Sequence, residues 1–220
     1  MIKKIIFVIG TGRSGTHFLG RTIGSHPLVE SHIEDPKYFN LATAIATHQD
    51  ILNPLYIRIQ KQRMLKRYKL LVKRSTFPYI LEKTHPNIWL AEYLKDNITN
   101  SLFVGIYRNQ YQTVASMMRH KGVISWYSTL PLNKPNQFLG ITDANKHHFA
   151  DLPLESKCAC RWLSHVRELY RLKKILKNQF MLLEYNAFVR NMDSCLIRLS
   201  EHLGTENRFE PEQIKSNTLD

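Results

Sequence analysis

A glycine-rich turn near the N-terminus is the part of the sequence that points most directly to chemistry. Gly10-Thr-Gly-Arg-Ser-Gly-Thr16 follows a run of apolar strand formers, residues 5–9, and leads into a segment with helical spacing. Such a turn gathers backbone N–H groups at the positive end of a helix, where phosphate binds. Gly10 and Gly15 have the spacing of the nucleoside-triphosphatase loop, but Thr16-His17 stands where that loop has Lys-[Ser/Thr].

The missing lysine changes which anion the turn suits. In triphosphate enzymes the lysine neutralises the β- and γ-phosphates and the following hydroxyl holds magnesium, so such an enzyme needs both. Here Arg13 instead places a cation inside the turn, beside the hydroxyls of Ser14 and Thr16. This favours a smaller anionic group bound without a metal, such as a phosphosulfate anhydride. The alternative is a glycine turn that only packs a strand on a helix.

Gly12-Arg-Ser-Gly-Thr16 resembles the 5′-phosphosulfate-binding loop of sulfotransferases, whose common form is [Pro/Gly]-[Arg/Lys]-Ser-Gly-Thr-Thr. The family's second signature is an arginine that closes a strand and a serine eight residues later, and Arg108 and Ser116 have this spacing. Their guanidinium and hydroxyl suit a phosphate. The resemblance implies 3′-phosphoadenosine-5′-phosphosulfate as co-substrate, with Arg108 and Ser116 at its 3′-phosphate. It places these residues at the 5′-phosphosulfate: Gly12, Arg13, Ser14, Gly15, Thr16 and His17.

The likeness covers roughly residues 5–204 and is nearest to bacterial and tyrosylprotein sulfotransferases. Leu183-Glu-Tyr185 resembles the end of a late strand in that family, which implies a nucleotide contact for Tyr185. Two residues depart from the family pattern: His17 replaces the usual second threonine, and Gln110 replaces the usual proline after Arg-Asn.

Three residues are candidates for the chemistry that this resemblance implies. Sulfuryl transfer needs a base for the acceptor proton and cations for the leaving oxygen. Glu34 lies 21 residues after Arg13, as the catalytic glutamate does in the tyrosylprotein branch. Lys83-Thr-His85 resembles the family lysine that contacts the sulfonate and the histidine base of the cytosolic branch. Lys83 is therefore expected at the sulfonate, and both Glu34 and His85 are candidates for the base, with Glu34 slightly favoured by its longer match.

Strands that alternate with helices predict an α/β fold with a doubly wound, central parallel sheet, flanking helices and a P-loop-like topology. The whole chain, 1–220, is expected to form one domain with an irregular tail from about 209. The expected strands are 5–9, 28–32, 78–82, 102–107 and 180–183. The expected helices are 14–24, 41–72 with a break at Asn53-Pro54, 87–94, 110–120, 154–177 and 193–203.

Residues 121–153 show no clear periodicity and are rich in Pro, Asn, Gly and Ser, which is typical of a long loop. Loops of this length in compact domains are often functional. We therefore predict that this segment forms a lid over the acceptor, with Trp126, Tyr127 and Phe138 as its aromatic residues.

The charge of the chain favours an anionic partner. Thirty-one Lys and Arg against 18 Asp and Glu give a net charge of +13, and residues 58–74 hold eight of the basic residues and no acid. The simpler interpretation of 58–74 is a solvated helix face; the other is a docking surface for an anionic acceptor. A nucleic-acid-binding module is disfavoured, because Tyr68 alone interrupts this run as a stacking aromatic would. A P-loop kinase or other nucleotide-binding protein is the alternative within the same fold.

The remaining composition predicts a reduced, cytoplasmic protein. Three cysteines in a chain of 220 residues suggest free thiols, and Cys158-x-Cys160 lacks the second pair of a zinc site, so no metal is expected. No apolar run approaches the ~20 residues of a membrane span. The acceptor is expected to be a small molecule, glycan or peptide, and the sequence leaves its identity and the oligomeric state open.

Overall fold

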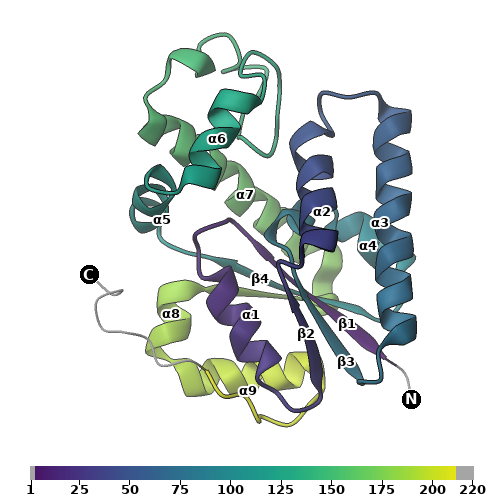
Figure 1. The fold of residues 1–220 in the computed structure, drawn as a ribbon. Helices are drawn as coiled ribbons and strands as arrows, with labels where there is room; N and C mark the ends of the chain where they lie inside the picture. Colours follow the sequence, from purple (N-terminus) through teal and green to yellow (C-terminus); the bar gives the residue numbers. More distant parts are fainter. Residues whose placement is uncertain (1–2, 212–220) are drawn as a thin grey trace.

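A five-stranded parallel sheet forms the centre of the molecule, with helices on both sides (Figure 1). The computed structural model describes residues 3–211. The strands lie in the order β2-β3-β1-β4-β5, and every neighbouring pair is parallel. They are β1 (Lys4–Gly10), β2 (Val29–Ile33), β3 (Tyr79–Lys83), β4 (Ser101–Tyr107) and β5 (Phe180–Glu184). The predicted parallel α/β sheet is confirmed.

Side chains that alternate along β1 divide the core into two layers. Ile5, Phe7 and Ile9 pack on one face of the sheet, and Ile6 and Val8 on the other. The first face is covered by α2 (Pro36–His48), α3 (Pro54–Arg74), α4 (Ala91–Asn97) and α7 (Leu154–Leu176). The second is covered by α1 (Thr16–Gly24), α8 (Tyr185–Arg190) and α9 (Met192–Leu203). Helices on both faces make the sheet doubly wound, as predicted.

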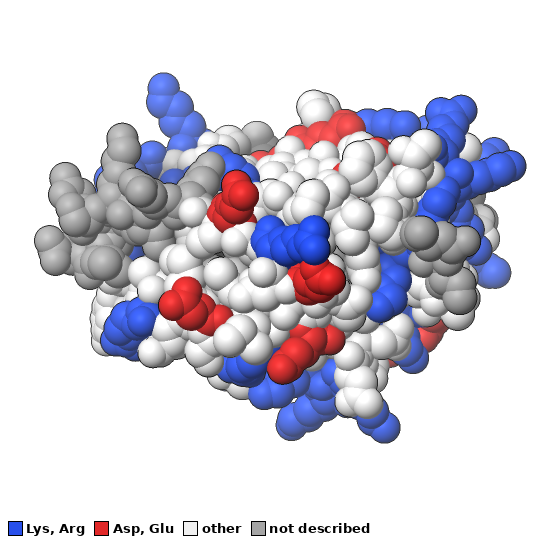
Figure 2. All heavy atoms as spheres, turned by 90° about the horizontal axis from the view of Figure 1, so that it is seen from below, with Lys and Arg blue, Asp and Glu red and all other residues white. Residues whose placement is uncertain are grey.

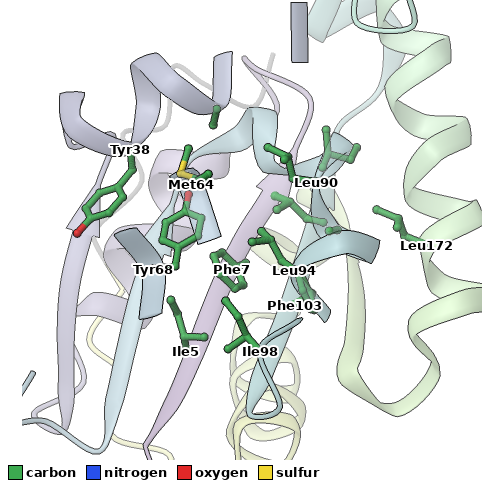
Figure 3. Packing of buried hydrophobic residues seen from close by; sticks show 14 of the residues in the cluster. Ile5, Phe7, Tyr38, Met64, Tyr68, Leu90, Leu94, Ile98, Phe103 and Leu172 are labelled. Carbon is green, nitrogen blue, oxygen red and sulfur yellow. The ribbon is translucent and has the colours of Figure 1, made fainter. Parts of the chain in front are cut away.

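Phe7 lies at the centre of the first core layer, which Figure 3 shows from close by. Its ring stacks on Phe103 of β4, with centroids 5.3 Å apart, and meets the edge of Tyr68 of α3 at 5.1 Å. Tyr68 in turn stacks on Tyr38 of α2, at 5.2 Å. These contacts fix α2 and α3 against the sheet, and the end of β2, which precedes α2, is held with them.

The predicted loop 121–153 is the largest error in the expected elements. After α5 (Gln110–Met118), the helix α6 (Lys121–Thr129) packs beside α7, beyond the end of the sheet (Figure 1). Only Val123 of α6 is fully buried, and Trp126 and Tyr127 one turn later are half-buried, so its apolar spacing covers a single turn and does not stand out in the sequence. The segment that follows is also held in place, since Phe138, Leu139 and Phe149 are fully buried.

Two further differences concern short helices. The expected helix 87–94 is a 3₁₀ turn, η1 (His85–Trp89), followed by α4, and the helix α8 directly after β5 was not predicted. Two more 3₁₀ turns are η2 (Phe149–Asp151) and η3 (Lys177–Gln179). The predicted tail begins with Phe209, which is buried beside His26 at 5.2 Å, and its residues 212–220 lie outside the described part of the chain.

The basic residues of 58–74 lie on α3, whose apolar residues Ile57, Met64 and Leu71 face the core while most of its lysines and arginines are exposed. On the face drawn in Figure 2, basic side chains gather along the outline and acidic ones lie among them across the middle. The exposed basic side chains of α3 are what a solvated helix face requires. Whether α3 docks an anionic acceptor stays a prediction.

A buried polar network lies under the end of β3. Thr84 donates a hydrogen bond to the Glu82 carboxylate, and Asn87 Nδ2 donates to Glu82 Oε2 and to the Tyr68 hydroxyl, at 2.7 Å each. Burial raises the pKa of Glu82 to about 8, against the lowering effect of these hydrogen bonds. Because neighbouring residues of an extended chain point to opposite sides, Lys83 and His85 point away from this network, toward the site described below.

Glu82 predicts a specific pH dependence of stability. Its folded-state pKa of about 8 lies above its ordinary value of 4.5, so the folded protein holds a proton that the unfolded chain releases between these values. The unfolding free energy of the wild type relative to Glu82→Gln should therefore fall by up to about 1.4 kcal/mol per unit as pH rises from 5 to 8. Urea unfolding at several pH values measures this difference. Glu155→Gln, at an exposed position of α7, is the control, and an equal slope there would contradict the assignment.

Candidate active site

The glycine-rich turn leaves the carboxyl end of β1 and enters α1, as predicted. Gly15 has φ 88°, and a Cβ at this position would lie 2.2 Å from the Tyr185 ring, so only glycine fits. Arg13 is also left-handed, with φ 73°. The side chains of Thr11 and Ser14 are hydrogen-bonded to each other at 3.0 Å and hold the turn from inside. No acidic side chain lies in the first turn of α1, so its positive end remains suited to an anion.

The second predicted motif meets the first at the same edge of the sheet. Arg13 Nε donates a hydrogen bond to Ser116 Oγ at 3.1 Å, across 103 residues of sequence. The guanidinium of Arg108 lies over the Tyr185 ring, 4.8 Å from its centroid, and its Nε donates to Gln112 Oε1 at 3.0 Å. Four side chains that were predicted for a nucleotide site thus lie close together with Gln112, and Ser116 accepts its hydrogen bond from Arg13. Gln112 was not predicted, because glutamine at a helix start carries no signal.

The departure at Gln110 has a simple structural setting. Gln110 is the first residue of α5, where the backbone N–H has no intrahelical partner and proline is common. Asn109 caps this helix, since its Oδ1 accepts from the N–H of Tyr111 at 2.9 Å. The helix start that positions Arg108 is therefore secured without the family's proline.

The three candidates for chemistry meet at the Glu34 carboxylate. Lys83 Nζ donates a hydrogen bond to Glu34 Oε1, and His85 Nδ1 lies 3.3 Å from the same oxygen. His17 Nε2 lies 3.3 Å from Glu34 Oε2, and His17 Nδ1 lies 3.1 Å from Lys83 Nζ. The unusual histidine at position 17 thus contacts both Glu34 and Lys83. These contacts of His17 were not predicted, because its partners lie on β3 and directly after β2.

Burial and neighbouring charges shift the pKa values of Glu34, Lys83 and His85 in different ways. Burial opposes ionisation of Glu34, but hydrogen bonds from His17 and His85 and the charge of Lys83 hold its pKa far below its usual range. Burial lowers the pKa of Lys83, while the Glu34 charge raises it. Burial also lowers the pKa of His85, to about 4, which leaves its imidazole neutral at neutral pH. His85 Nε2 is buried and has no hydrogen-bond partner among residues 3–211.

A cavity of about 380 Å³ opens beside this cluster. Arg13, His17, Glu34 and His85 line one side of it. The other side is formed by residues from α2, α6, α7 and their flanks: Phe39, Thr43, His120, Gly122, Val123, Ser125, Trp126 and Arg161. Larger hollows exist, such as one of about 520 Å³ beside His26, but the residues that line them are not those of the two motifs.

The predicted acceptor lid is only partly supported by the lining of this cavity. Trp126 lines it from α6. Phe138 is fully buried and packs under Trp126, with ring centroids 4.7 Å apart, and Tyr127 packs toward Phe149. The segment is therefore a packed wall around the cavity, and the prediction of a loop-shaped lid with three aromatic residues is wrong for Phe138. Arg161, also in this wall, was missed because one arginine in a long helix carries no sequence signal.

Two negative findings apply to residues 3–211. No three histidine, cysteine, aspartate or glutamate side chains are grouped there as metal ligands. No helix in this part of the chain is long and apolar enough to cross a membrane. All three cysteines are free thiols.

Several solved protein structures have a fold similar to that of this chain. A sulfotransferase from Alicyclobacillus acidocaldarius has a similar fold, with a TM-score of 0.61 and 15% identity over 99% of this chain and 89% of that one. The sulfotransferase domain of the curacin biosynthetic pathway has a TM-score of 0.62 and 13% identity, and the match covers 96% of this chain and 76% of that one. Mouse sulfotransferase SULT7A1, complexed with PAP, has a TM-score of 0.52 and 18% identity, and the match covers 93% of this chain and 61% of that one.

Comparison of the sequence with the patterns that describe protein families identifies the family of this chain. None of the curated protein sequences compared with the chain matched it. The sequence pattern that describes the sulfotransferase family, however, matches residues 6–211, which is nearly all of the part that the structure describes. The chain therefore belongs to the sulfotransferase family.

Proposed function

We propose that the protein transfers the sulfuryl group of 3′-phosphoadenosine-5′-phosphosulfate to a hydroxyl or amine acceptor. The hydrogen bond between Arg13 and Ser116 is the observation that carries the proposal, because it joins the two donor motifs in one site. The tight turn at Gly15 supports it, since the missing side chain there lets Tyr185 pack directly on the turn. The PAP complex of mouse SULT7A1, a protein of similar fold, is consistent with this donor.

The donor would lie along the carboxyl edge of the sheet. The N–H groups of residues 12–17, with Arg13 and the hydroxyls of Ser14 and Thr16, would hold the 5′-phosphosulfate. Arg108 and Ser116 would bind the 3′-phosphate, and Tyr185, which packs on Arg108 and closes over Gly15, would contact the nucleotide.

We assign the base to His85 rather than to Glu34. The Glu34 carboxylate is engaged by three donors and holds a proton weakly, whereas His85 is neutral with its Nε2 free of partners at the cavity wall. Glu34 accepts at His85 Nδ1 and so directs the Nε2 lone pair toward the acceptor.

In the proposed transfer one proton moves to the base and one S–O bond breaks. As the acceptor oxygen bonds to sulfur, its proton passes to His85 Nε2 and the bridging S–O bond breaks with its electron pair on the nucleotide oxygen. Lys83, whose ammonium is held beside Glu34, would stabilise the negative charge that builds on that oxygen. The products are the sulfated acceptor and 3′-phosphoadenosine-5′-phosphate.

The donor site predicts tight binding of the product nucleotide without a metal. Calorimetric titration should show binding of 3′-phosphoadenosine-5′-phosphate in EDTA, and weaker binding of ATP and GTP. Arg108→Gln should weaken it about 10- to 100-fold, since it removes charge-assisted hydrogen bonds to phosphate. Arg119→Gln, an exposed arginine at the end of α5, is the control and should change affinity less than twofold. Magnesium-dependent preference for ATP would instead support a P-loop kinase.

The assignment of the base predicts an order among variants. His85→Gln should lower kcat by about 10²–10⁴-fold, the usual contribution of a general base. Glu34→Gln should lower it less, because it removes only the group that orients His85. Both variants should bind the product nucleotide within about threefold of wild type, which shows that they are folded. Single-turnover assays with a panel of phenols, alcohols and amines measure the order, and the reverse order would make Glu34 the base.

The low pKa of His85 predicts the acid side of the pH profile. A base titrating at about 4 stays deprotonated, and therefore active, at every pH above that value. We expect kcat/KM to remain constant from pH 8 down to about pH 5 and to fall only as the pH approaches 4. A decline centred near 6.5, the ordinary histidine value, would show that His85 is not the buried base described here.

A further inference from the structure

Arg161 of α7 is a buried cation without a counter-charge. Its side chain is fully buried, yet its only hydrogen bond among the described residues is a weak one, from Nη1 to Met117 Sδ at 3.7 Å. Nε and Nη2 have no hydrogen-bond partner within the part of the chain that the structure describes. Burial lowers the pKa of Arg161 only to about 10, so the guanidinium stays charged at neutral pH. An unpaired buried charge is strongly destabilising, and a ligand that pairs with it removes that cost.

Two aromatic rings fix the orientation of this guanidinium. Its Cζ lies 4.7 Å from the ring centroids of both Trp126 and Phe138, close enough for cation–π attraction. The rings meet edge to face at 4.7 Å and form one corner in which the guanidinium is held. The N–H groups are thus positioned in advance, although nothing in residues 3–211 accepts from Nε or Nη2.

Several of the unpaired polar atoms in residues 3–211 lie beside the candidate active-site cavity. Nine buried side-chain nitrogen or oxygen atoms in the described part of the chain lack a partner, and four of them belong to residues that line this cavity: Thr43, His85 and, twice, Arg161. Arg161 Nη2 and His85 Nε2 lie 3.7 and 3.2 Å from the position that a Cβ would take at Gly12. They therefore converge on one point of the cavity.

The acid in this wall cannot neutralise Arg161. Glu34 is the only carboxylate that lines the cavity among the described residues, and it already pairs with Lys83, His17 and His85. Phe39, Val123 and Trp126 supply an apolar surface beside the charged point. The cavity thus combines an unneutralised cation, a free imidazole nitrogen and space for carbon atoms.

We propose that Arg161 binds a carboxylate of the acceptor, so that the enzyme sulfates hydroxyl-bearing organic acids. The acceptor hydroxyl would lie at His85 Nε2 and the carboxylate at Arg161 Nη2 and Nε. Because both nitrogens face the same point beside Gly12, the hydroxyl and the carboxylate are separated by only a few bonds. The hydroxyl's role rests on the proposed function, whereas the anion site at Arg161 does not.

Matched ligands with and without charge test this proposal. The probes are 2-, 3- and 4-hydroxybenzoate and their methyl esters, titrated by calorimetry into the full chain, both alone and saturated with 3′-phosphoadenosine-5′-phosphate. At least one hydroxybenzoate should bind ten or more times tighter than its ester. Arg161→Met should reduce that ratio to below two and leave the affinity for the nucleotide within about threefold. Arg161→Lys, which keeps the charge but not the paired N–H groups, should give an intermediate ratio.

Arg167→Met is the matched control, since Arg167 lies on the same helix at an exposed position and its loss changes the net charge equally. It should leave the ratio unchanged. Equal affinity of all acids and esters for the wild type would overturn the proposal, as would a ratio that survives in Arg161→Met. If Arg161→Met loses nucleotide affinity instead, the arginine serves the donor and the proposal is wrong. Failure of the wild type to bind the nucleotide would contradict the proposed function, while the titrations without nucleotide would still decide the anion site.

Discussion

The buried ammonium of Lys83 is the group around which the site is organised. Its side chain is fully buried, so its charge needs an anionic partner that is held at a fixed position. The pairing of β2 with β3 provides that partner, because Ile33 lies opposite Lys83 and the N–H of Glu34 donates to the Lys83 carbonyl at 2.9 Å. The register of two strands thus sets the distance between a lysine and a carboxylate 49 residues apart.

Glu34 takes a strained backbone conformation in that position. Its φ is 48°, in a region that residues with a side chain rarely adopt, and Arg13 in the phosphate loop is left-handed as well. Strain of this kind persists where the surrounding structure determines the conformation, and it is concentrated at functional sites. Both residues carry charges at the same edge of the sheet. We infer that the fold accepts local strain in order to place one cation and one anion beside the donor loop.

The sequence predicted the parts of this arrangement that depend on local patterns. The strand β1, the turn after it and the arginine that closes β4 follow from short runs and spacings, and the expected order of strands and helices matches the structure apart from α6, α8 and the 3₁₀ turns. Arg13, Glu34 and Lys83 were predicted from the family resemblance. The hydrogen bonds of Arg13 to Ser116 and of Lys83 to Glu34 could not be predicted, because they depend on strand register and on side-chain direction.

The parts that were not predictable all involve tertiary contacts with weak local signals. The helix α6 has one turn of apolar spacing, Val123 with Trp126 and Tyr127, which is too short to stand out in the sequence, and it is held by packing on α5 and α7. His17 looked like the loss of a phosphate-binding hydroxyl, yet it contacts Glu34 and Lys83. The contacts at each of these positions form only when segments distant in the sequence come together in the fold.

The acceptor side of the cavity follows a different physical rule from the donor side. The donor loop uses backbone N–H groups, which any sequence with the right turn can present. The acceptor wall uses side chains from α2, α6 and α7, and these can change without disturbing the sheet. A buried arginine without a carboxylate partner costs stability in the free protein. A ligand that supplies the missing charge would remove this cost, so that the protein gives up stability in the free state for recognition of the ligand. We therefore infer that the wall at Arg161, rather than the glycine-rich turn, determines which acceptor is chosen.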